Sequence, residues 1–560
     1  MLDTNLSFST YDEKKKIGAF YTPTEASQIL CEWAIRSSTD RILEPSFGGC
    51  DFLEQTKFRL ERLGSGSPIQ QIFGSDIDEM AFTHLFEKLG INKKNGNFLK
   101  SDFLALSPQN FSTQKFDVII GNPPYISHHN MSERQKHDAK AAIKHSGFSV
   151  PNRASLWAYF ILHSFSFLRT EGRMAWILPG SFLFTEYATG IRKEIENRFE
   201  RAIAIQLRER IFLSKGSDES TVIVLCDGFI GNQSKTIFEI GFANNLQDLR
   251  ELIASWKLNQ WNGKRLSGRP EILLMDDDSR KVYEKMVKNE NCHDLSKYMK
   301  IQIGIVTGAN SFFIISQEAA DAHKFPENAL KPILPKFFLC KGLCLTHKDI
   351  ENARNDNIPC LLINTDCMRK GCRIYNYLET FPKDQKEKNR TFEKRAIWYK
   401  PDDGKIPDAF FPYMQNYGPR IVLNKIGVTS TNTIHRVFFK PNTQKYLQKL
   451  VAISILTTFS QLSAEIEGRS YGSGVLKHEP SEAKKIKIYI PDNLDKKEIT
   501  KTFNLIDHHF QNNDPGSAQK IADNFIFNGL ENKFGTHFLK TLSSGLNESR
   551  FRRQGKKQNA

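Results

Sequence analysis

The sequence predicts an α/β domain with a mostly parallel sheet in the first half of the chain, followed by a mixed α+β region. Three features support this prediction. In residues 1–230 short apolar runs alternate with stretches of helical spacing, most apolar runs end at a Gly, Pro, Asp or Glu turn, and the alternation is lost after about residue 250. Ligands of parallel sheets bind beyond the carboxyl ends of the strands. Residues that follow the apolar runs are therefore the first candidates for a functional site.

Four apolar runs have the length and the flanking turns of buried strands, at residues 41–43, 71–74, 116–120 and 174–178. Residues 24–34, 79–89 and 155–168 have the spacing of helices. The polar, basic stretch 128–153 is typical of a long loop. The alternation of strands and helices is that of a parallel sheet with helical crossovers.

Charge is distributed unevenly along the chain. Residues 1–250 carry 29 Lys and Arg against 29 Asp and Glu, and residues 251–560 carry 49 against 34, so the whole formal net charge of +15 lies in the second half. A neutral half joined to a basic half fits a division in which one half does chemistry and the other binds a polyanion. A solvated, Lys-rich surface would give the same count.

Neither a membrane span nor an export signal is expected. No apolar run is long enough to cross a bilayer, and the first residues lack the basic-then-apolar order of a signal peptide. Nine cysteines, an odd number at irregular spacings, fit reduced thiols. Five of them lack the paired spacing of a structural zinc site, so we assign no metal ligands: Cys340, Cys344, Cys360, Cys367 and Cys372. We therefore expect a cytoplasmic protein without a membrane partner.

The motif with the clearest chemistry follows the third apolar run, where the chain continues into Asn122-Pro123-Pro124-Tyr125. An exocyclic amino nitrogen is a weak nucleophile because its lone pair is delocalised into the ring. Two acceptors directed at its N–H groups would localise that pair: the Asn122 side-chain oxygen and a backbone carbonyl that the prolines hold in place. Tyr125 offers a flat face on which a base can stack. The alternative is an ordinary turn after a strand.

Further blocks around this motif extend the pattern. The chain resembles the amino-group methyltransferases of DNA, whose signature is an Asn/Asp-Pro-Pro-aromatic loop after a buried strand. The order of its blocks over residues 15–230 is similar to that of the gamma-class, TaqI-like N6-adenine enzymes of restriction–modification systems. The resemblance implies a Rossmann-like S-adenosylmethionine-dependent methyltransferase domain followed by a mixed α+β target-recognition domain. It also implies methyl transfer to the N6 amino group of adenine in duplex DNA, by base flipping and direct in-line transfer.

The same resemblance implies S-adenosyl-L-methionine as cofactor. The residues that it assigns to the cofactor are Tyr21, Thr22, Pro23, Glu44, Ser46, Gly48, Asp76, Ile77, Asp102, Phe103 and Asn122. Thr22 would contact the methionine end, next to the free N–H groups at the start of a helix. Glu44 would face the positive amino or sulfonium end. Cys50 stands where the family often has a later glycine, and a cysteine does not readily adopt a positive φ.

Two blocks would hold the nucleoside part of the cofactor. Asp76 would accept from both ribose hydroxyls, as an acidic residue after the second strand often does, and Ile77 would pack on the cofactor adenine. Asp102 would accept from the adenine amino group and Phe103 would cover the ring. For Asp76 and Asp78 the alternative is capping of the next helix, and we expect one of the two to do so.

Downstream, residues 211–225 resemble the family's eighth block, in which Phe212 would face the flipped base together with Tyr125. A core Phe is the alternative. Residues 304–313 resemble the opening of the target-recognition domain. Candidate base or phosphate contacts beyond it are Arg420, Asn424, Lys425, Asn432, His435 and Arg436.

These observations predict three parts. We expect a cofactor-binding catalytic methyltransferase domain at 1–240, a DNA target-recognition domain at 250–540 and a basic, disordered tail at 541–560. The partners implied are double-stranded DNA and a cognate restriction endonuclease acting on the same site. A protein glutamine or RNA N-methyltransferase is the alternative, since a side-chain amide poses the same chemical problem. An inactive specificity subunit is a third interpretation, against which the intact 122–125 loop and Asp76 count.

Overall fold

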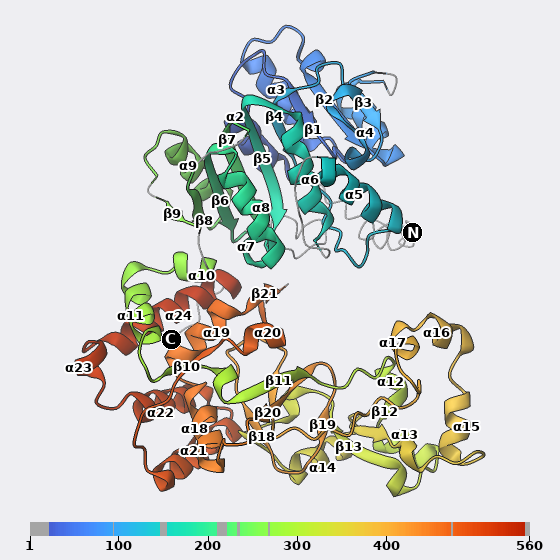
Figure 1. Ribbon diagram of the computed structural model, residues 1–560, viewed down its shortest axis with the longest axis vertical. Coiled ribbons are helices and arrows are strands. Elements are labelled where there is room, and N and C mark those ends of the chain that lie inside the picture. Colours follow the sequence, from blue (N-terminus) through green and yellow to red (C-terminus); the bar gives the residue numbers. More distant parts are fainter. Residues whose placement is uncertain are drawn as a thin grey trace, which may run out of the picture. The chain divides into compact units, whose positions relative to one another are not determined.

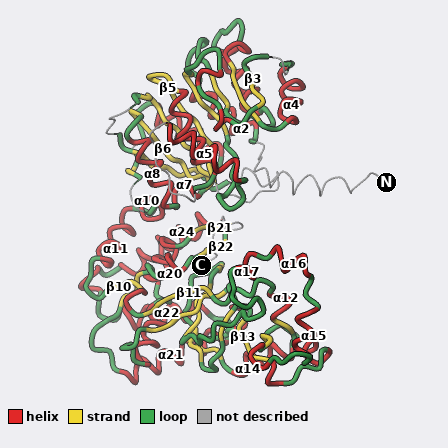
Figure 2. Tube along the Cα trace, turned by 45° about the vertical axis from the view of Figure 1, so that its right-hand side comes forward, coloured by secondary structure: helices red, strands yellow, loops and turns green. Residues whose placement is uncertain are grey.

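The computed structural model describes residues 22–92, 95–145, 154–209, 221–231, 236–261, 263–266, 269–471 and 474–554. The chain forms two compact units, Met1–Leu274 and Met275–Ala560, whose helices and strands are shown in Figures 1 and 2. Within the described ranges, no helix has the length and apolar composition needed to cross a membrane.

The first unit is built on a nine-stranded sheet of order β3-β2-β1-β4-β5-β7-β6-β8-β9. Its strands are β1 Ile42–Glu44, β2 Ile72–Asp76, β3 Phe98–Lys100, β4 Phe116–Gly121, β5 Leu168–Pro179, β6 Phe199–Leu207, β7 Thr221–Phe229, β8 Phe238–Ala243 and β9 Lys264–Arg265. The five strands from β3 to β5 pair in parallel, and β7 runs antiparallel to β5 and β6. The predicted α/β domain with a mostly parallel sheet is confirmed.

Helices cover both faces of this sheet (Figure 1). They are α2 Thr24–Ala34, α3 Asp51–Arg62, α4 Glu79–Leu89, α5 Glu133–His145, α6 Leu156–Ser164, α7 Ser181–Phe184, α8 Glu186–Glu196 and α9 Leu246–Lys257. Val118 and Ile120 of β4 belong to the core under α2, α3 and α9, whereas Ile119 belongs to the core under α5, α6 and α8. Because alternate residues of a strand point to opposite faces, a strand covered on both sides is apolar at every position.

Two boundaries differ from the sequence prediction. The first unit does not end at residue 240, because β8, α9 and β9 complete it up to Leu274. The apolar face of α9 packs on the sheet, where the rings of Trp256 and Trp33 lie 5.8 Å apart. The loop expected at 128–153 contains helix α5, because Ala139 and Ile143 lie on one helical face and are buried.

The second unit contains several small sheets. Their orders are β11-β20-β16-β18-β14, β12-β15-β13-β19, β17-β22-β21 and β10-β23. The strands are β10 Cys292–Asp294, β11 Met299–Ile303, β12 Ile314–Ile315, β13 Leu330–Leu334, β14 Cys344–Leu345, β15 Leu361–Ile363, β16 Ala409–Pro412, β17 Met414–Gln415, β18 Val422–Asn424, β19 Thr429–Ser430, β20 Ile434–Phe439, β21 Arg469–Tyr471, β22 Val475–Lys477 and β23 Lys487–Tyr489.

Helices are interspersed among and follow these strands, as expected for a mixed α+β unit. Before and between the strands lie α10 Pro270–Leu273 (at the end of the first unit), α11 Asp277–Val287, α12 Asn310–Phe313, α13 Gln317–Ala322, α14 His347–Asn355, α15 Arg373–Glu379, α16 Lys383–Lys388 and α17 Arg390–Glu393. The later helices are α18 Lys445–Ser454, α19 Thr458–Glu467, α20 Pro480–Ala483, α21 Lys496–Gln511, α22 Pro515–Phe527, α23 Glu531–Phe534 and α24 Phe538–Gln554.

The disordered tail expected at 541–560 is wrong for residues up to 554, which continue helix α24. The guanidinium of Arg553 donates two hydrogen bonds of 2.7 Å to the two carboxylate oxygens of Glu465 in α19. Arg550 lies 3.7 Å from the same carboxylate, and all three side chains are buried. The basic residues that suggested a solvated tail therefore neutralise a buried acid. Residues 555–560 lie outside the described ranges.

This ion pair generates a stability prediction. Arg553→Met should lower the free energy of unfolding of the second unit by about 3 kcal/mol, because it leaves Glu465 buried with only Arg550 nearby. Urea denaturation measures the change. Lys540→Met also replaces a basic side chain with methionine, but at an exposed position of α24. It should change the free energy of unfolding by less than about 0.5 kcal/mol. Equal effects of the two substitutions would show that the pair does not hold the helix.

Candidate active site

Three strand ends bring the predicted site residues to one edge of the sheet. Strand β1 lies between β2 and β4, with Glu44 opposite Gly74 and Leu43 opposite Ile119 (Figure 1). All three strands run in the same direction, so Glu44 at the end of β1, Asp76 at the end of β2 and Asn122 just after β4 share the carboxyl edge. The convergence expected from the sequence is therefore present in the fold.

Asp76 connects the loop after β1 to the turn after β2. One of its carboxylate oxygens accepts a hydrogen bond from the Gly48 N–H at 2.9 Å, and the other accepts from the Asp78 N–H at 2.9 Å. Burial raises the pKa of Asp76. The Asp78 side chain accepts from Met80 N at 3.1 Å and caps α4. Of the two acids, Asp78 is thus the helix cap, and Asp76 faces the glycine loop.

The loop itself turns on two residues with positive φ. Gly48 has a φ of 42° and Cys50, the N-cap of α3, has a φ of 63°. A positive φ at Cys50 is unexpected, because a cysteine rarely adopts a left-handed conformation. The side chain of Cys50 is nonetheless fully buried and its Sγ lies 3.7 Å from the Ala81 carbonyl. Tight packing against α4 accompanies this conformation.

Glu44 and Ile77 have unusual environments for their types. Glu44 is only 3% exposed, and its Oε2 atom has no hydrogen-bond partner among the described residues. Burial, followed by the nearby Asp51 and Asp76 carboxylates, raises its pKa well above the usual range for a glutamate. Ile77, next to Asp76, is 54% exposed although it is apolar. A buried acid and an exposed aliphatic side chain thus flank the ends of neighbouring strands.

The Asn-Pro-Pro-Tyr loop is held by contacts from three other segments. The Asn122 amide nitrogen donates to the Thr22 hydroxyl at 3.4 Å, just before Pro23, the N-cap of α2. The Ser46 hydroxyl donates to the Asn122 backbone carbonyl at 3.5 Å. The Tyr125 hydroxyl donates to the Ile177 carbonyl of β5 at 3.2 Å. Residues that the sequence placed in separate blocks therefore meet around this loop.

Asp102 and Phe103 have different environments. Asp102 is half-buried, accepts from Leu104 N at 3.0 Å and has a pKa that burial raises. The Phe103 ring is 1% exposed and packs in the core against the rings of His163 and Phe167, at 4.9 and 5.0 Å. The ring therefore lies in the core, and its predicted contact with a cofactor stays a prediction. Tyr21 and Phe212 lie outside the described residues.

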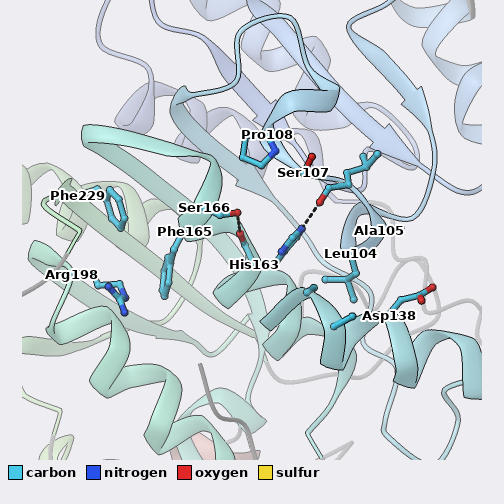
Figure 3. A pocket seen from close by; sticks show the side chains of 13 residues that line it. Leu104, Ala105, Ser107, Pro108, Asp138, His163, Phe165, Ser166, Arg198 and Phe229 are labelled. Atoms are coloured by element: carbon cyan, nitrogen blue, oxygen red, sulfur yellow. Dashed lines mark hydrogen bonds between the residues drawn. The ribbon is translucent and has the colours of Figure 1, made fainter. Parts of the chain in front are cut away.

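The first unit contains a cavity of about 680 Å³, whose lining includes Leu104 and His163 (Figure 3). Ser166, just before β5, and Arg198, just before β6, belong to its lining. His163 in its wall shares a 2.9 Å hydrogen bond with the Leu106 carbonyl, and burial lowers the pKa of its imidazole. Of the predicted site residues that the structure describes, none lines this cavity, which lies towards the amino ends of β5 and β6.

Most of the polar residues proposed as DNA contacts in the second unit have structural partners. Arg436 is 5% exposed and donates to both Asp403 oxygens, at 2.7 and 2.9 Å. Arg420 donates to the Cys340 carbonyl, and the Asn424 amide donates to two backbone carbonyls. His435 is fully buried. Arg436 and His435 are buried in structural contacts, whereas Arg420 and Asn424 are half-buried and Lys425 is exposed, so DNA contacts by these three stay predictions.

The described part of the chain contains no group of three or more His, Cys, Asp or Glu side chains that could hold a metal ion. The cysteines at 340, 344, 360 and 372 are free thiols. The side chain of Cys367 lies outside what the structure describes.

Comparisons with known proteins give a family for each half of the chain. Residues 5–248 match the family N-6 DNA Methylase, and residues 269–527 match the family Type II methyltransferase M.Eco57I, C-terminal domain. The Type II methyltransferase M.AccI of Acinetobacter calcoaceticus is 23% identical over 88% of this chain and 89% of its own length. The Type II methyltransferase M.XamI of Xanthomonas campestris pv. amaranthicola is 20% identical over 86% of each.

Two matching solved structures have low sequence identity and TM-scores below 0.5. The Type IIL restriction–modification enzyme MmeI in complex with DNA is 11% identical, with a TM-score of 0.49 over 99% of this chain and 74% of that chain. The type IIG restriction endonuclease BpuSI is 16% identical, with a TM-score of 0.41, and the chain spans 66% of its length. The family matches cover both units, one after the other. The chain belongs to the N-6 DNA methylase family and is an adenine-specific type II DNA methyltransferase of a restriction–modification system.

Proposed function

We propose that the first unit binds S-adenosyl-L-methionine at the carboxyl ends of β1, β2 and β4 and methylates N6 of an adenine flipped out of duplex DNA. The observation that carries this proposal is the convergence of Glu44, Asp76 and Asn122 on one sheet edge. The N-6 DNA methylase family uses this cofactor. Parallel incubations of labelled cofactor with duplex DNA, RNA and protein test the substrate class, and N6-methyladenine in digested DNA is the expected product.

The residues at the edge fit the chemical groups of the cofactor. The buried Oε2 atom of Glu44 has no hydrogen-bond partner among the described residues, so it can face a cationic group of the cofactor. Each Asp76 oxygen accepts one backbone N–H and keeps a second lone pair that a ribose hydroxyl can use. The exposed Ile77 provides an apolar surface for the adenine ring. When bound, the cofactor supplies an electrophilic methyl group on a sulfonium sulfur.

The Asn122 loop would activate the target nitrogen. Its amide nitrogen faces the Thr22 hydroxyl, so the side-chain oxygen points away from Thr22 and can accept from the adenine amino group. The backbone carbonyl of Pro123, fixed by the neighbouring proline, would be the second acceptor. Two acceptors favour a tetrahedral nitrogen with a localised lone pair. A neutral amide oxygen is a very weak base, so the departing proton goes to solvent after transfer.

Tyr125 would hold the flipped base. Its hydroxyl is tied to the Ile177 carbonyl, and this contact restricts the ring before any base arrives. Stacking on a fixed ring helps to offset the cost of unpairing the target. The catalytic group proposed is therefore Asn122, Pro123, Pro124 and Tyr125.

We infer that the second unit binds double-stranded DNA. Residues 275–560 carry 45 Lys and Arg against 32 Asp and Glu, so +13 of the chain's formal net charge of +15 lies in this unit, and a basic surface binds phosphates with release of counterions. The matched relatives are named type II methyltransferases. A restriction endonuclease that cleaves the same site when it is unmethylated is the protein partner that we propose.

Asn122→Ala should abolish turnover but change the dissociation constants for cofactor and DNA only slightly, because the lost acceptor acts mainly in the transition state and Asn122 is one of many residues assigned to the cofactor. Single-turnover kinetics and binding titrations measure the two effects. Asn197→Ala, at an exposed position after α8, is the matched control and should retain activity. Turnover of Asn122→Ala near that of the control would refute the role of Asn122.

Asp76→Ala should weaken cofactor binding by about 1–3 kcal/mol, which is the usual loss for a charge-assisted hydrogen-bond acceptor. Calorimetric titration with S-adenosylmethionine measures the change. Asp78→Ala removes only the cap of α4 and should lower thermal stability while leaving cofactor affinity intact. If Asp78→Ala loses affinity and Asp76→Ala does not, the ribose contact belongs to Asp78.

A protein that ends at Leu274 should still bind the cofactor but lose site-specific DNA methylation. The DNA affinity of the full chain should fall steeply with rising salt, because each neutralised phosphate releases counterions. Methylation mapping and filter binding at several salt concentrations measure both effects. Site-specific methylation by the first unit alone, or an affinity that does not respond to salt, would contradict the division of roles.

A further inference from the structure

The Glu44 carboxyl at the end of β1 is enclosed by the protein. The side chain is 3% exposed, and it lies so close to β4 that a Cβ atom on Gly121 would be 3.7 Å from its Cγ. The backbone N–H of Leu53 hydrogen-bonds to the carboxyl, but Oε2 has no partner among the described residues. Buried acceptors are nearly always satisfied. An unsatisfied oxygen beside the Asn122 loop therefore points to a ligand group.

The charges around Glu44 do not stabilise a carboxylate. The negative charges of Asp51, the first residue of α3, and of Asp76 in β2 both raise the pKa of Glu44. The positive charge of Lys88 in α4 lowers the pKa of Glu44. Its ammonium, however, lies 2.9 Å from an Asp51 oxygen and is paired with that carboxylate. The net field of these three groups on Glu44 is negative, so a carboxylate at this position is repelled as well as desolvated.

Two cysteine thiols are the other titratable groups near Glu44. Cys31 of α2 and Cys50 at the start of α3 are both buried. Burial raises the pKa of Cys31 to about 12, and burial also raises the pKa of Cys50. Both are neutral near pH 7 and supply no charge. Burial, then Asp51 and Asp76, raises the pKa of Glu44 itself.

We propose that Glu44 carries a proton in the free protein and releases it when the cationic end of the cofactor binds beside Oε2. The step breaks the Glu44 O–H bond, the proton passes to the solvent buffer, and the resulting carboxylate faces the ligand cation. This inference rests on the proposed cofactor site. It makes Glu44 a residue that selects for positive charge, because a neutral ligand leaves it protonated.

The proposed proton release fixes the direction in which cofactor affinity changes with pH. A cation beside the carboxyl lowers the pKa of Glu44 in the complex below its raised value in the free protein. Between these two values the complex holds fewer protons than its components, so cofactor affinity rises with pH. At pH values below both pKa values, Glu44 is protonated in the free protein and in the complex. At pH values above both, it is ionised in each. In these two ranges cofactor affinity does not depend on pH.

Calorimetry of the full chain at about pH 6.5, where the ligand's α-amino group is still protonated, measures the proton directly. Titrations with S-adenosylmethionine in two buffers of different ionisation enthalpy should show release of up to about one proton per cofactor. Glu44→Gln, of the same shape, should release none, and Glu61→Gln, on the exposed side of α3, should behave like the unmodified protein. Binding without proton release, or equal release by Glu44→Gln, would overturn the inference.

The demethylated product separates the two cationic groups of the cofactor. S-adenosylhomocysteine keeps the ammonium and lacks the sulfonium charge. Proton release with both ligands assigns Glu44 to the ammonium, and release with S-adenosylmethionine alone assigns it to the sulfonium; both results support the coupling. Absence of any saturable heat with the unmodified protein would instead overturn the cofactor site, and the inference with it.

Two further measurements protect the test against misfolding of the Glu44 variant. The infrared carbonyl band of a protonated buried carboxyl should disappear when cofactor is added to the unmodified protein. Asp51→Asn removes a repelling charge and frees Lys88, so it should release a smaller fraction of a proton at the same pH. An unchanged infrared band, or undiminished release by Asp51→Asn, would contradict the proposal.

Discussion

The parallel hydrogen bonding of β1 between β2 and β4 is the constraint on which the site depends. It aligns the ends of three strands that are far apart in the sequence, and each end carries one polar group: Glu44, Asp76 or Asn122. The Gly48 and Asp78 amides then fix Asp76, and Thr22 and Ser46 fix the loop after β4. A shift of β1 by one residue would turn Glu44 to the opposite face of the sheet and remove it from this edge.

The parts of the site that the sequence predicted are those with local causes. A buried apolar run followed by Asn-Pro-Pro-Tyr specifies both a strand and a rigid loop, so Asn122 was found from a short stretch. Asp76 was proposed in the same way, at the end of an earlier apolar run. Asp51 was missed, although it stands next to Cys50, because its effect on Glu44 arises only when α3 packs beside β1.

The environments that the sequence did not predict depend on distant partners. Arg553 was assigned to a disordered tail because its neighbours are basic, but its partner Glu465 is 88 residues away. Phe103 matched a motif, whereas its burial is decided by His163 and Phe167, which come from another segment. Tertiary packing sets these environments, and a single sequence does not display it.

The closure of the second unit by its last helix has a consequence for the order in which the protein forms. The hydroxyl of Ser279 in α11 donates to the Thr541 carbonyl in α24, a contact that spans 262 residues. The strands of the first unit are all made by residue 265. On the ribosome the methylase sheet can fold while synthesis continues. The packing of the second unit is completed only after Arg553 has been synthesised and can pair with Glu465, so this unit matures later.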